Sequence, residues 1–183
     1  LQYYYLLFYL FESLMHQWFI ELMRRFNLLA SLFDEERCQA IESSAPETNP
    51  FLDSQIVCVS LDYLTGSPER YAQVLETDWD LLIVDEAHHL EWTPEIASTA
   101  YRMVEGLSEK IPSVLLLTAT PQQLGPEGHF ARLRLLDPIR YNDLETFVKE
   151  SDHYQEMAEL VDCIDRKDSL NDSEWGMIKT TVP

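Results

Sequence analysis

The chain has 183 residues, of which 46% are apolar, and a formal net charge of −19. Its length suggests roughly one domain, and its apolar content is enough for a buried core, which excludes a wholly disordered chain. The negative charge argues against a self-sufficient nucleic-acid-binding protein, because such proteins displace phosphate counterions with a basic surface.

The N-terminal segment and the cysteines indicate the compartment. The first eleven residues, LQYYYLLFYLF, are apolar but lack the basic start and the small-residue cleavage site of a signal peptide. Glu12 and His16 interrupt this run before it reaches the length of a membrane span. Three widely spaced cysteines disfavour a disulfide framework or a zinc site. We therefore expect a cytoplasmic protein without a membrane partner.

Five apolar runs have the length of strands that are buried on both faces of a parallel sheet. They lie at about residues 3–10, 28–33, 55–60, 80–85 and 113–118, and the run at 28–33 is the weakest. Helical patterns separate them. This alternation predicts an α/β fold, a parallel sheet with helices on both faces that is built from right-handed crossovers.

The clearest helical pattern covers residues 13–26. It places Leu14, Trp18, Leu22 and Phe26 at spacings of four, which puts them on one face of a helix. We expect that face to pack against the sheet.

Three other segments have distinct patterns. Residues 43–53 are polar with two prolines and are expected to form a surface loop. A helix is expected over 94–110, because Thr93 can cap it and Pro94 suits its first turn. Residues 141–164 have a long amphipathic helix pattern, and residues 171–179 a shorter one. The C-terminal part is therefore expected to be helical and to contain no strand.

Polar residues follow two of the expected strands directly. Asp85 and Glu86 end the run at 80–85, and Thr118 and Thr120 flank Ala119 at the end of the run at 113–118. The carboxyl ends of parallel strands form the edge where ligands bind. Adjacent carboxylates there suit phosphoryl transfer, since one can hold Mg²⁺ through its water shell while the other deprotonates the attacking water.

These motifs resemble a known family. DEAH (85–88) and TATP (118–121) are similar to motifs II and III of superfamily 2 helicase-like ATPases. The surrounding sequence resembles the Swi2/Snf2 branch, and within it the bacterial members that associate with RNA polymerase. The similarity is dense from about His16 to Asp143 and is carried by HQWFIELMRRFNL, CVSLDYL, WDLLIVDEAHHLEW and LLLTATPQQLGPEGHFARLRLLDPIRYND.

The resemblance implies roles for these residues. Asp85 would coordinate Mg²⁺ and Glu86 would be the general base for attack on the γ-phosphate of ATP. His88 with Thr118, Ala119 and Thr120 would couple hydrolysis to movement on nucleic acid. The implied cofactors are ATP and Mg²⁺, and the implied partners are duplex DNA and the core RNA polymerase, whose recycling in transcription this subgroup promotes.

Gln17 and Trp18 fall in the segment that resembles motif Ia, whose helix lies near the nucleic-acid backbone in this family. For Trp18 the competing interpretation is packing of the helix against the core. Both interpretations are kept as hypotheses.

The sequence also departs from the family pattern. A phosphate-binding loop needs Gly-Lys followed by Ser or Thr, and none of the four lysines follows a glycine. Phe11 stands where the family has a proline at the end of a strand. We therefore expect residues 1–140 to be part of the first RecA-like lobe without Walker A, residues 141–183 to be a helical linker or appendage, and the isolated chain to be inactive.

Two other functions compete with this one. The chain could be a non-catalytic interaction module whose acidic surface docks a protein partner such as RNA polymerase. It could also be a metal-dependent hydrolase that uses His88 or His89, although no HExxH spacing is present.

Overall fold

The computed structural model describes residues 4–119 and 125–165, with the side chains of the last helix described as far as Tyr154. The chain divides into two compact units, Leu1–Arg140 and Tyr141–Pro183. In the second unit, helix α7 (Leu144–Asp165) confirms the long amphipathic helix. The Asp143 carboxylate caps it by accepting a hydrogen bond from the Thr146 amide at 2.8 Å. The shorter helix expected at 171–179 lies outside the described residues.

The first unit contains a five-stranded sheet in which every strand pairing is parallel. Its order is β2-β3-β1-β4-β5, so that the two strands followed by the DEAH and TATP motifs are neighbours. The fold is the predicted α/β fold, a partial RecA-like lobe. The strands are β1 (Leu6–Leu10), β2 (Ser31–Phe33), β3 (Ile56–Ser60), β4 (Leu81–Val84) and β5 (Val114–Leu116).

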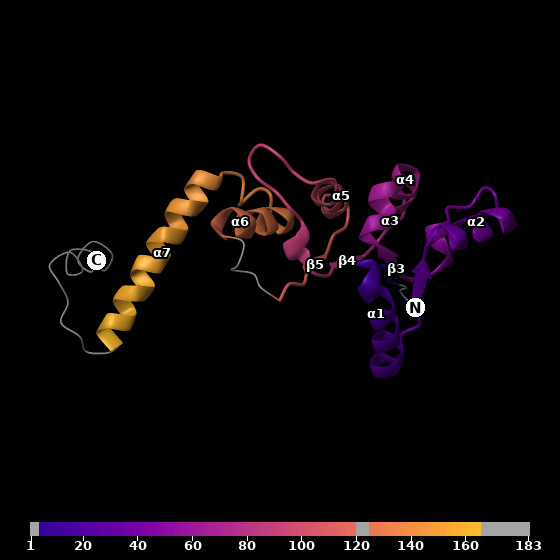
Figure 1. Cartoon of the computed structure of the whole chain (residues 1–183), viewed down its shortest axis with the longest axis horizontal. Helices are drawn as coiled ribbons and strands as arrows, with labels where there is room; N and C mark the ends of the chain where they lie inside the picture. Colours follow the sequence, from indigo (N-terminus) through magenta and orange to yellow (C-terminus); the bar gives the residue numbers. More distant parts are fainter. Residues whose placement is uncertain (1–3, 120–124, 166–183) are drawn as a thin grey trace. The chain divides into compact units, whose positions relative to one another are not determined.

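Alternate residues of the central strands bury two different faces. In β4, Leu82 and Val84 belong to one apolar cluster and Ile83 belongs to the other. The first cluster includes residues of helices α2 to α6, whereas the second packs against helix α1, which lies on the opposite side of the sheet from α3 and α4 (Figure 1). Because both faces are covered, the central strands are continuous apolar runs.

The helices of this unit separate the strands in the expected alternating order. The long helix predicted at 13–26 is present, and Phe26 at its end is 67% exposed and does not join the packed face. The helices are α1 (Glu12–Phe26), α2 (Glu35–Ser44), α3 (Leu61–Gly66), α4 (Pro68–Leu75), α5 (Thr99–Ser108) and α6 (Gly125–Leu136).

The helix predicted over 94–110 begins later than expected, because α5 starts only at Thr99. Residues 93–96 form a turn in which the Thr93 amide donates to the Ile96 carbonyl at 2.8 Å. The turn is closed by an antiparallel bridge between Trp92 and Ala97. Ser98 is the actual N-cap and accepts from the Tyr101 amide at 3.1 Å. The prediction mistook a Thr-Pro turn for a helix start.

The segment 43–53 is also only partly the surface loop that was predicted. Residues Pro50–Asp53 form a short 3-10 helix in which Pro50 and Phe51 are buried. The Phe51 ring stacks on the Phe33 ring with their centroids 5.1 Å apart. The segment is therefore anchored to the core through an aromatic residue that its polar composition obscured.

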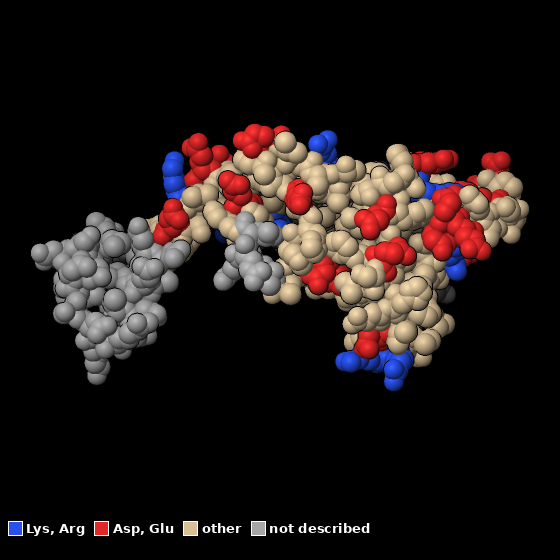
Figure 2. Space-filling view, viewed as in Figure 1, with Lys and Arg blue, Asp and Glu red and all other residues tan. Residues whose placement is uncertain are grey.

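The surface of the described residues is mainly acidic. Acidic side chains are spread over much of the face shown in Figure 2, whereas basic side chains form small separate groups. None of the described helices is both long and apolar enough to cross a membrane.

Candidate active site

The polar motifs after β4 and β5 meet at the carboxyl edge of the sheet. The Leu117 amide donates to the Val84 carbonyl, and the Ala87 amide donates to the Leu117 carbonyl, both at 2.8 Å. These bonds continue the pairing of the two strands past their ends. They fix DEAH next to the segment that begins TATP, which is the arrangement expected from the sequence.

Both oxygens of the Asp85 carboxylate accept hydrogen bonds. The Trp18 indole N–H donates to Oδ2 at 2.7 Å, and the Glu86 amide donates to Oδ1 at 2.9 Å. Each oxygen of a carboxylate has a second lone pair. Asp85 is therefore held in one orientation and can still accept further hydrogen bonds from water.

Glu86 adopts an unusual conformation. Its φ is 50° and its ψ is 42°, the left-handed region that is costly for any residue with a Cβ. Its Oε2 is buried without a hydrogen-bond partner among the described residues and lies 3.0 Å from the Nδ1 atom of His88. A strained backbone and an unsatisfied carboxylate oxygen at one residue are typical of functional sites.

His88 links Glu86 to the next strand. Its Nδ1 atom is 3.4 Å from the Thr118 hydroxyl, so the predicted contact between DEAH and TATP is present. Ala119 is exposed at the same edge, and Thr120 lies outside the described residues. His89 faces away from this group, since its ring packs edge-on against Phe11 with their centroids 4.9 Å apart.

Trp18 and Gln17 lie beside the two carboxylates. They line a cavity of about 290 Å³ together with Asp85 and Glu86. The Trp18 ring is partly buried and packs against Phe8 with their centroids 5.3 Å apart. Core packing and a contact with the site thus occur in the same side chain, whereas the hypothesis of a nucleic-acid contact stays a prediction.

Sequence reasoning missed part of this wall. Leu14 and Glu21 also line the cavity, three residues before Gln17 and three residues after Trp18. Their helical spacing was the available signal. The bond from Trp18 to Asp85 joins residues 67 positions apart and has no local signature.

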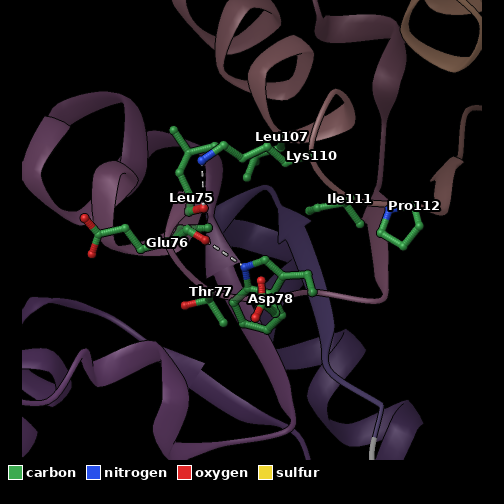
Figure 3. A pocket seen from close by; sticks show the side chains of 10 residues that line it. Leu75, Glu76, Thr77, Asp78, Leu107, Lys110, Ile111 and Pro112 are labelled. Atoms are coloured by element: carbon green, nitrogen blue, oxygen red, sulfur yellow. Dashed lines mark hydrogen bonds between the residues drawn. The ribbon is translucent and has the colours of Figure 1, made fainter.

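A second cavity lies at the opposite edge of the sheet, before β4 and β5 begin. It has a volume of about 420 Å³, and Lys110 donates there to the Leu75 carbonyl at 3.3 Å (Figure 3). The Trp79 indole donates to the Val74 carbonyl at 2.9 Å. These polar groups satisfy the ends of α4 and the strands, and none of the predicted site residues is among them.

The conformation of Glu86 gives a first testable prediction. Replacing Glu86 with Gly is expected to stabilise the 183-residue chain by about 1 kcal/mol, because glycine relieves the left-handed strain and removes the buried oxygen. Urea unfolding monitored by circular dichroism measures the change. Asn27→Gly is the control, since Asn27 has a φ of 54° but asparagine tolerates this region. A less stable Glu86→Gly chain would contradict the interpretation.

Comparisons with known proteins agree with this arrangement. Residues 11–171 match the family described as the SNF2-related domain. The RNA polymerase-associated protein RapA of Vibrio atlanticus (strain LGP32) is 60% identical over 150 residues, which are 82% of this chain and 15% of that protein. RapA of Photobacterium profundum is 59% identical over the same shares.

A third relative extends the aligned region. RapA of Vibrio cholerae serotype O1 (strain M66-2) is 53% identical over 167 residues, 91% of this chain and 17% of that protein. The chain thus spans about one sixth of the length of these relatives. With its parallel sheet, its DEAH and TATP edge and these similarities, the chain belongs to the SNF2-related domain family.

Proposed function

We propose that the chain supplies the magnesium-holding and water-activating half of a nucleic-acid-dependent ATPase of the Swi2/Snf2 family. The observation that carries this proposal is Glu86, whose buried Oε2 has no hydrogen-bond partner among the described residues and whose backbone is held in a strained conformation. A carboxylate so placed is available to accept a proton.

The donor set fits a magnesium ion that keeps its waters. Carboxylate oxygens are the hard ligands that Mg²⁺ prefers, and both oxygens of Asp85 are already oriented by hydrogen bonds. Asp85 would hold the ion through water, and the bound ion would neutralise charge on the phosphates. Among the described residues no group of three or more His, Cys, Asp or Glu side chains is arranged to hold a metal directly.

Glu86 would act on the attacking water. As the water oxygen bonds to the γ-phosphorus of ATP, Glu86 takes the proton, and the bond from the γ-phosphorus to the bridging oxygen breaks to leave ADP and phosphate. The proton on Glu86 would then lie beside His88, whose Nδ1 atom faces both Glu86 and Thr118. His88 and Thr118 would transmit the change to the segment after β5.

The proposed partners follow from the relatives. Three relatives are named as RNA polymerase-associated proteins, and we extend this association with RNA polymerase, and its recycling in transcription, to the longer protein. DNA is the proposed nucleic acid. The acidic surface of this chain favours a basic protein surface over the phosphate backbone as its direct contact.

The test is the release of phosphate from ATP by a longer protein that contains this chain. We expect release that needs Mg²⁺ and rises when duplex DNA is added, and no release by the 183-residue chain alone. A longer protein that binds core RNA polymerase but hydrolyses no ATP would contradict the proposal and favour the non-catalytic interaction module.

The bond from Trp18 to Asp85 gives a second prediction. In the longer protein, Trp18→Phe is expected to raise the Mg²⁺ concentration for half-maximal hydrolysis about fivefold, because Asp85 loses a charge-assisted hydrogen bond while the ring packing is kept. Magnesium titrations of turnover measure this effect. Trp92→Phe, which removes an indole remote from Asp85, is the control. An unchanged magnesium requirement in Trp18→Phe would show that the bond is only structural.

A further inference from the structure

Arg132 in α6 is a buried cation without a matching anion. The side chain is 6% exposed, and its Nε and Nη2 atoms are buried with no hydrogen-bond partner among the described residues. Burial lowers the pKa of this guanidinium, but an arginine keeps its charge. A buried unpaired charge destabilises a folded chain, so that this position needs an explanation beyond packing.

The guanidinium lies in the wall of a cavity of about 340 Å³ that His88 and Trp92 also line. The Trp92 ring packs against Phe130 and Tyr101, with centroid distances of 5.5 Å and 6.3 Å. The Tyr101 hydroxyl donates to the Ala131 carbonyl at 2.9 Å, next to Arg132 in the chain. The wall that carries Arg132 is therefore fixed by aromatic packing and a buried hydrogen bond.

The two unpaired nitrogens define the chemistry of the ligand. Nε and Nη2 form one edge of the guanidinium plane, and their two N–H bonds match the two oxygens of one carboxylate or one phosphate. Two exposed carboxylates, Glu91 and Glu127, also line the cavity. They would repel a nucleic-acid backbone, which carries a charge on every phosphate and is too broad to reach a buried edge. A single carboxylate at the end of a slim side chain meets neither obstacle.

We propose that this cavity binds the carboxylate of an aspartate or glutamate side chain from a protein partner, with Arg132 as its bidentate ligand. The site is separate from Asp85 and Trp18, although His88 touches both regions. It depends on the unpaired arginine and not on ATP hydrolysis, so that it stands or falls independently of the proposed function.

The first test uses propionate, which has the carboxylate of a glutamate side chain, as the probe. In the ¹⁵N-labelled 183-residue chain, the Nε–H resonance of Arg132 is expected to shift progressively and to saturate as propionate is added at constant ionic strength. Propionamide, which is neutral and of similar size, should cause no shift. Dimethyl phosphate represents a nucleic-acid phosphodiester, and a shift with this probe alone would overturn the assignment of a carboxylate.

The second test uses stability. Arg132→Met is expected to raise the Tm of the chain by about 3 °C in the absence of propionate, because it removes an uncompensated buried charge. Propionate should raise the Tm of the unaltered chain and leave that of Arg132→Met unchanged. Arg134→Met is the matched control, since Arg134 lies over the Trp92 ring and faces Glu105 at 3.7 Å. It should keep the response to propionate. A chain whose Arg132 resonance and Tm ignore propionate would overturn the proposal.

Discussion

Replacing Glu86 with Gln in the longer protein is expected to lower the turnover of ATP by about a hundredfold or more. The amide keeps the size of the side chain but cannot take a proton from water. The loss should appear in kcat, while the affinity for ATP stays within a few-fold, because Asp85 and its two hydrogen bonds are unchanged.

Phosphate release under saturating ATP, with a separate measurement of nucleotide binding, checks this prediction. Glu21→Gln is the matched control, because Glu21 lines the same cavity but pairs with Arg25 on the surface of α1. Its turnover should stay close to that of the unaltered protein. Normal turnover in Glu86→Gln would remove Glu86 from the role of general base.

The largest change in stability is expected from Arg70→Met. Arg70 in α4 is 7% exposed and donates to the Glu35 carboxylate at 2.7 Å and 3.0 Å, and to the Glu42 carboxylate through both terminal nitrogens. These bonds join α4 to α2. Their loss should destabilise the chain by about 2 kcal/mol, the lower end for charged hydrogen bonds, since both carboxylates stay in contact with water.

The same network predicts a pH dependence. Hydrogen bonds from Arg70 hold the pKa of Glu35 at about 2 instead of the ordinary 4.5, and they also lower the pKa of Glu42. Because these folded-state pKa values are depressed, the stabilisation is complete above about pH 4.5 and is lost as the pH falls toward 2. The stability difference between the unaltered chain and Arg70→Met should therefore shrink over this range.

Urea unfolding at several pH values between 2 and 7 measures both effects. The control is Arg37→Met, which breaks the exposed ion pair of Arg37 with Asp53 and should change stability much less. A difference between the unaltered chain and Arg70→Met that is independent of pH would contradict the coupling of Arg70 to Glu35.

The sheet could be predicted because burial on both faces leaves a local signature. The apolar run before Asp85 is continuous, since Leu82 and Val84 pack on one face and Ile83 on the other. The position of Asp85, Glu86 and Thr118 at one edge then followed from parallel pairing. Their roles came from the resemblance to a family and not from this geometry.

Other features could not be read from local sequence. The Thr93-Pro94 pair has the composition of a helix start, but the bridge between Trp92 and Ala97 closes a turn there instead. The left-handed conformation of Glu86 contradicts its side chain, since glutamate has no preference for this region. The unpaired state of Arg132 depends on which helices and loops surround it, and no pattern within α6 indicates it.

The most direct test of the central claim is to map where the metal of the ATP complex lies in the longer protein. Fe²⁺ can replace Mg²⁺, and with ascorbate it cleaves the backbone close to its site. We expect cleavage around Asp85 and Glu86 that requires ATP and disappears in Asp85→Asn. Cleavage elsewhere in the chain, or cleavage that Asp85→Asn leaves unchanged, would contradict the placement of the magnesium and the attacking water at the carboxyl end of β4.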